Sequence, residues 1–135
     1  MPRDIPVGNG NLLVAFDLDY RIRDIYFPWI GQENHAGGQE FRFGVWVDGC
    51  FSWVGPDWKS DLRYRDESLV TQVRLTSEAL KLEIHCQDSV DFKLNVYLKR
   101  VDVVDLSGRS RDVRLFFNHN FSLPVRRNRK RPAHR

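Results

Sequence analysis

The residues best suited to chemistry gather in one segment, residues 26–38, which mixes aromatics, amides, glycines, one acid and one histidine. Amide and acid side chains hydrogen-bond sugar hydroxyls, and an aromatic ring stacks on the face of a pyranose. The candidate substrate-binding residues are therefore Trp29, Gln32, Glu33, Asn34 and His35. The same composition suits a polar loop that caps a sheet or seats a domain interface, and this is the interpretation we favour.

Catalysis by this chain alone is not predicted. Hydrolysis of a glycoside needs two carboxylates across a cleft, one of them with a raised pKa. The chain has 18 acidic residues, but most fall on polar strand faces or in turns, and the neighbouring residues single out no pair as catalytic. The sequence also lacks a Gly-x-Ser-x-Gly motif, a cysteine in a basic environment and a phosphate-binding loop. We therefore predict no catalytic residues.

No metal site and no cofactor are predicted either. The four histidines lack mutual ligand spacing, and Cys50 and Cys86 are far apart with no second cysteine near either. Strand periodicity places His85 on a polar face. It places His119 on the apolar face of the last strand, where we expect a hydrogen-bonded core histidine.

The charge is divided unevenly along the 135 residues. The whole chain has a net charge of +3, but residues 124–135 contain six basic residues and no acid. The preceding 123 residues are therefore mildly acidic and show no cluster of basic residues that would bind nucleic acid. The chain has no apolar run of the roughly 18 residues that cross a bilayer, and no secretory signal is visible. Two cysteines are too few for a disulfide scaffold, so a cytoplasmic location is expected.

The elements that must position these residues are strands. Apolar and polar residues alternate over residues 80–87, 41–47 and 92–98, as in half-buried strands. The alternation slips at Lys99-Arg100, which suggests a bulge. Further strands are expected at 11–17, 21–27, 69–75, 101–106 and 111–123, and residues 57–68 are expected to form a loop.

Turn residues between these strands favour hairpins. Asp48-Gly49 lies between two apolar runs and is a strong signal for a two-residue turn. Short strands at this spacing, with no amphipathic helical pattern, predict an all-β fold, an antiparallel β-sandwich.

Several segments resemble one known family in order and spacing. The first two are Arg23-Asp24-Ile25-Tyr26-Phe27-Pro28 and Gly31-Gln32-Glu33-Asn34-His35, which follow Val7-Gly8-Asn9-Gly10-Asn11. The later ones are Phe41-Arg42-Phe43-Gly44-Val45-Trp46-Val47-Asp48-Gly49, Phe51-Ser52-Trp53 and Val113-Arg114-Leu115-Phe116-Phe117-Asn118-His119-Asn120-Phe121. Residues 1–123 thereby resemble the N-terminal β-sandwich of prokaryotic glucoamylase-like enzymes, glycoside hydrolase family 15.

This resemblance implies a supersandwich, galactose-mutarotase-like fold that is incomplete here. In the family, the sandwich precedes an (α/α)6 barrel whose two glutamates hydrolyse α-glucosidic bonds with inversion. The resemblance therefore implies a non-catalytic domain fragment, residues 1–123, that packs against such a barrel and shapes its entrance, with α-glucan as the substrate class. Residues 124–135 do not match the family and are expected to form a basic, disordered tail, which an altered reading frame would explain.

Two alternatives remain open. The first is a stand-alone carbohydrate-binding module that uses Trp29, Trp46, Trp53 or Trp58. The second is a nucleic-acid-binding protein that uses the basic tail. No membrane partner is expected. If the family sandwich continues beyond Leu123, the strand at 111–123 lacks a partner, and the chain is expected to self-associate through this edge.

Overall fold

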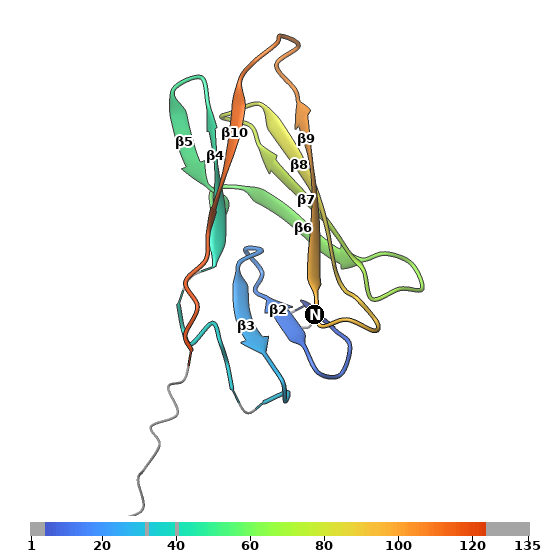
Figure 1. Ribbon diagram of the computed structural model, residues 1–135. Coiled ribbons are helices and arrows are strands. Elements are labelled where there is room, and N and C mark those ends of the chain that lie inside the picture. The colour runs from blue at the N-terminus through green and yellow to red at the C-terminus, as the bar shows by residue number, and fades with distance from the viewer. Residues whose placement is uncertain (1–4, 32, 40, 124–135) are drawn as a thin grey trace, which may run out of the picture.

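The computed structural model describes residues 5–31, 33–39 and 41–123, which form ten strands and no helix (Figure 1). All strand pairs are antiparallel, so the predicted all-β antiparallel fold is confirmed. The strands are β1 (Ile5–Gly8), β2 (Leu13–Phe16), β3 (Ile22–Tyr26), β4 (Arg42–Val47), β5 (Cys50–Trp53), β6 (Lys59–Tyr64), β7 (Thr71–Ser77), β8 (Leu82–Val90), β9 (Tyr97–Asp105) and β10 (Val113–Asn118).

The strands form three sheets that share one core. Their orders are β1-β2-β3, β10-β4-β5 and β6-β7-β8-β9. A backbone bridge between Ile22 and Phe41 connects β3 to the start of β4. The largest fully buried side chains come from all three sheets, which makes one continuous apolar interior: Val7, Val14, Phe16, Val45, Val47, Val73, Leu75, Leu82 and Ile84.

Alternation explains which side chains enter this core. On β7, Val73 and Leu75 are buried while Gln72 and Arg74 are exposed, because successive side chains of a strand point to opposite faces. The turn between β4 and β5 is the predicted Asp48-Gly49 pair. Both residues have positive φ, +52° and +76°, as a two-residue hairpin turn of this type requires.

The structure corrects the prediction around residues 92–106. Residues 91–96 form a loop rather than the start of a strand, and Phe92 and Leu94 are exposed. The Asp91 carboxylate accepts the backbone N–H groups of Lys93 and Leu94, which turns the chain before β9 begins. β9 then pairs with β8 in continuous register from Tyr97 to Asp105, so the bulge predicted at Lys99-Arg100 is wrong.

Two further predictions are wrong. Residues 59–64, expected within a loop, form β6, whose Leu62 and Tyr64 pack against the core while the alternate positions are charged. His119 is not a core residue: the last strand ends at Asn118, and His119 is exposed with its ring stacked on Phe41 at 5.7 Å between centroids. The predicted tail, residues 124–135, lies outside the described residues.

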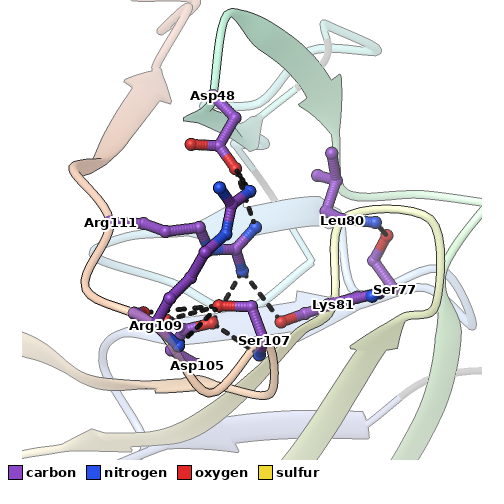
Figure 2. A network of polar contacts seen from close by, with 8 residues as sticks. All are labelled: Asp48, Ser77, Leu80, Lys81, Asp105, Ser107, Arg109 and Arg111. Atoms are coloured by element: carbon purple, nitrogen blue, oxygen red, sulfur yellow. Dashed lines mark hydrogen bonds and ion pairs between the residues drawn. The ribbon is translucent and has the colours of Figure 1, made fainter.

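Arg111 connects the sheets at the end of the molecule where β4 and β5 turn (Figure 2). Its side chain is only 5% exposed and donates to the Asp48 carboxylate at 3.3 Å, the Asp105 carboxylate at 2.8 Å and the Lys81 carbonyl at 3.0 Å. These three residues belong to the β4–β5 turn, the β7–β8 turn and the end of β9. One guanidinium therefore ties the β10-β4-β5 sheet to the β6–β9 sheet, and we call this contact the Arg111 clamp.

Candidate functional site: the loop of residues 27–39

Asn34 holds the loop against β3. Its side-chain carbonyl accepts the backbone N–H groups of Ile25 at 3.1 Å and Ala36 at 3.0 Å, and its amide donates to the Asp24 carboxylate at 2.6 Å. The Asn34 backbone also bridges to Tyr26. Since the side-chain oxygen accepts two backbone N–H groups and the amide nitrogen donates to Asp24, Asn34 positions the loop.

His35 joins the loop to the segment that follows β10. Its ring nitrogens lie 2.8 Å from the Phe27 carbonyl and 3.3 Å from the Ser122 carbonyl, and its own carbonyl accepts the Ser122 N–H at 2.6 Å. A neutral imidazole has one N–H and can donate to only one of these carbonyls. Gly37 permits the close approach, because a Cβ there would lie 2.6 Å from the Ser122 Cβ. His35 is therefore a structural connector.

Three large apolar residues of the loop lie next to these hydrogen-bonded positions. Phe27, Trp29 and Ile30 are exposed, with Trp29 at 62%, and His35 holds the Phe27 carbonyl at the start of this stretch. Glu33 is half-buried in the same loop. Gln32, the remaining predicted site residue, lies outside the described residues. The loop thus presents an anchored apolar tip, and we call Phe27, Trp29 and Ile30 the loop tip.

The other tryptophans are already engaged. Trp58 is buried and donates its indole N–H to the Ser52 hydroxyl at 3.0 Å. The guanidinium of Arg42 lies 4.2 Å from the centroid of Trp53, and that of Arg114 lies 4.9 Å from the centroid of Trp46. These cation–π contacts cover a ring face that a sugar would need. Of the four tryptophans, Trp29 alone is largely exposed.

Asp88 organises a buried polar cluster that the sequence interpretation missed. Its carboxylate, fully buried, accepts the hydroxyls of Tyr20, Tyr97 and Thr71 and pairs with the Lys99 ammonium at 3.1 Å. Strand alternation could have predicted that Asp88 is buried, since it continues the inward-facing series of Leu82, Ile84 and Cys86 on β8. A carboxylate closed to solvent cannot reach a substrate, so the cluster is structural.

The phenol and thiol groups near Asp88 are held neutral. Burial, followed by the charge of Asp88, raises the pKa of both Tyr20 and Tyr97, so both phenols keep their protons and donate them to the carboxylate. Burial raises the pKa of the Cys86 thiol to about 11, which leaves this cysteine unreactive near neutral pH. The cluster therefore holds no nucleophile.

The outer face of the β6–β9 sheet carries a lattice of charges around an open hollow of about 390 Å³. The register aligns Asp61, Arg74, His85 and Asp102 in one row across the four strands. Glu83 accepts from Arg74 and from His85, and these bonds lower its pKa, so it stays ionised and cannot act as a general acid. Other charges of this face are also paired, Arg63 with Asp61 and Arg100 with Asp102.

Among the described residues, no three His, Cys, Asp or Glu side chains are placed to hold a metal ion. In the same part of the chain, no helix has the length and apolar character needed to cross a membrane. Comparisons of this chain with protein-family models, with curated proteins and with solved structures find no match.

Proposed function

We propose that this chain acts as the non-catalytic β-sandwich of a glucoamylase-like glycoside hydrolase, and that its loop tip docks against an (α/α)6 catalytic barrel near the entrance to the active site. The α-glucan class of substrate is part of the proposal. Its support on the sequence side is the series of segments, from residue 7 to residue 121, that resembles the N-terminal sandwich of family 15.

The observation that carries the docking role is the anchored loop tip. Phe27, Trp29 and Ile30 are exposed in a loop whose two ends are held by hydrogen bonds. His35 holds the Phe27 carbonyl at one end, and the Asn34 side chain accepts the Ile25 and Ala36 N–H groups at the other. A loop tethered at both ends loses less conformational entropy on binding than a free one, and each large side chain that it buries contributes about 1.5–3 kcal/mol. Such a tip suits a docking surface better than a hydroxyl-binding site, because the polar side chains of Asn34 and His35 bond to other groups of this chain.

A binding experiment tests the proposal. The chain is titrated against a family 15 catalytic barrel that lacks its own sandwich, and binding is followed by calorimetry. We expect Trp29→Ala to weaken binding by at least about tenfold. The matched control is Leu69→Ala, which removes an equally exposed apolar side chain from the β6–β7 turn and should leave affinity unchanged.

Hydrolysis of maltooligosaccharides is measured on the chain alone in the same experiment, and no product is expected. Failure of the barrel to bind would overturn the docking role. Hydrolysis that disappears with Glu33→Gln would overturn the non-catalytic role. Quenching of tryptophan fluorescence by maltooligosaccharides without the barrel, abolished by Trp29→Ala, would favour a stand-alone carbohydrate-binding module instead.

A further inference from the structure

The edges of the three sheets differ in how they are protected from pairing with another chain. Natural edge strands carry proline, alternating charges or an inward-pointing charge, or are kept short. Four edges of the described sheets are protected in one of these ways. β1 contains Pro6, and β5 is only four residues long. β6 carries the alternating charges Lys59, Asp61 and Arg63, and β9 has inward-facing Lys99 with outward-facing Arg100 and Asp102.

The edge of β3 is partly occupied, because its two ends bridge to Asn34 and Phe41. β10 has no comparable protection. It pairs only with β4 among the described strands, in unbroken register from Val113 to Asn118, and Arg114 is its single charged residue. Phe116 and Phe117, on opposite faces, are each 48% exposed. The strand is therefore regular and exposes one large aromatic side chain on each face.

We propose that β10 pairs antiparallel with β10 of a second copy of this chain, about a two-fold axis through Leu115. In this register Leu115 lies opposite Leu115 of the other copy, and Val113 lies opposite Phe117. On the outer face Arg114 lies opposite Phe116. Opposed residues of an antiparallel pair point to the same side, so the core face of one β10-β4-β5 sheet continues into that of the other.

The sequence of β10 is complementary to itself, which identifies a second copy of this chain as the partner at its free edge. Residues 112–118 hold one acid, Asp112, and one base, Arg114, so two copies meet without net repulsion. The register places apolar against apolar on the inner face and a guanidinium beside an aromatic ring on the outer face, twice in each dimer. A closed two-fold arrangement satisfies both free edges at once and leaves none for further addition.

Disulfide trapping tests the register. Leu115→Cys in a Cys50→Ser background brings two Cα atoms opposite each other across the strands, within the 4.4–6.8 Å or so that a disulfide spans, and we expect a covalent dimer under mild oxidation. Phe116→Cys in the same background is the control, since its two copies are offset along the strands and should not cross-link. Cross-linking at position 116 in place of 115 would overturn the proposal.

Light scattering after size exclusion tests the association without any cysteine. Phe116→Lys sets a lysine opposite Arg114 at both symmetric positions, and we expect the dimer dissociation constant to rise by at least about tenfold. Leu69→Lys is the matched control, because Leu69 is an exposed apolar residue in the β6–β7 turn of another sheet, away from β10. A wild-type chain that stays monomeric up to high micromolar concentration overturns the proposal. No barrel is present in either assay, so this result is independent of the proposed docking of the loop tip.

Discussion

Charged side chains tie the β6–β9 sheet to its neighbours at two places, and water reaches these places unequally. Lys99 and Asp88 meet inside the molecule, where Tyr20 adds a residue from the β2–β3 turn. The Arg111 clamp lies at the end of the sandwich, where its partners Asp48 and Asp105 are 42% and 30% exposed. Similar ion pairs therefore operate in two different dielectric environments.

Access to water decides how much each ion pair contributes to stability. Removing one member of a buried pair leaves the other charge without water or partner, which is strongly destabilising. An exposed carboxylate that loses its partner is solvated by water, so loss of the ion pair lowers the free energy of unfolding only slightly. The Asp88 cluster is therefore expected to decide whether the core forms, and the clamp to decide how firmly two turns stay together.

The largest effect is expected at Asp88. Asp88→Asn keeps the shape of the side chain but leaves the Lys99 ammonium, 16% exposed, without its counter-charge. We expect a loss of about 3–5 kcal/mol in the free energy of unfolding, measured by urea denaturation. Such a loss is a large fraction of the total free energy of unfolding of a single domain.

A double variant controls for the change of shape. Asp88→Asn combined with Lys99→Met removes both charges, and it should recover most of the lost stability because no buried charge remains unpaired. If the double variant is as unstable as Asp88→Asn alone, the contrast between buried and exposed pairs drawn above does not hold.

A smaller effect is expected at the clamp. Arg111→Ala removes three hydrogen bonds from a side chain that is almost fully buried, and we expect Tm to fall by roughly 4–8 °C. Arg109→Ala is the matched control, because Arg109 contacts the same Asp48 carboxylate at 2.7 Å from a largely exposed position. It should lower Tm by no more than about 2 °C in differential scanning calorimetry. Equal effects would mean that burial of Arg111 does not matter.

Local patterns predicted the parts of the fold that depend on neighbouring residues. Asp48-Gly49 predicted its turn because few sequences adopt positive φ at two successive positions. Leu82, Ile84 and Cys86 predicted the buried face of β8 by simple alternation. The β6 strand was missed because its apolar positions, Leu62 and Tyr64, are few and its other positions are charged.

The sequence pattern was misleading where side chains bond to the backbone, because the alternation of apolar and polar residues does not reveal such hydrogen bonds. Phe92, Leu94 and Val96 continue the pattern of a strand, but the Asp91 carboxylate captures two backbone N–H groups and turns the chain. In the candidate site, residue types alone left sugar binding and capping of the sheet both open. Asn34 and His35 bond to backbone groups of this chain, which only the fold reveals.

The smallest effect concerns the pH dependence of the clamp. The backbone N–H of Ser107, and then the Arg111 guanidinium, lower the pKa of Asp105 to about 2 from the usual 3.8. A carboxylate with a lowered folded-state pKa stabilises the fold above its unfolded pKa, and this contribution is lost as pH falls through the folded value. We therefore expect the urea midpoints of wild type and Asp105→Asn to differ most above about pH 4 and to converge towards pH 2. Asp66→Asn, an exposed carboxylate in the β6–β7 turn, is the control and should follow the wild-type midpoint at each pH. A difference between wild type and Asp105→Asn that stays constant from pH 5 to pH 2 would show that the Asp105 charge is not what holds the clamp.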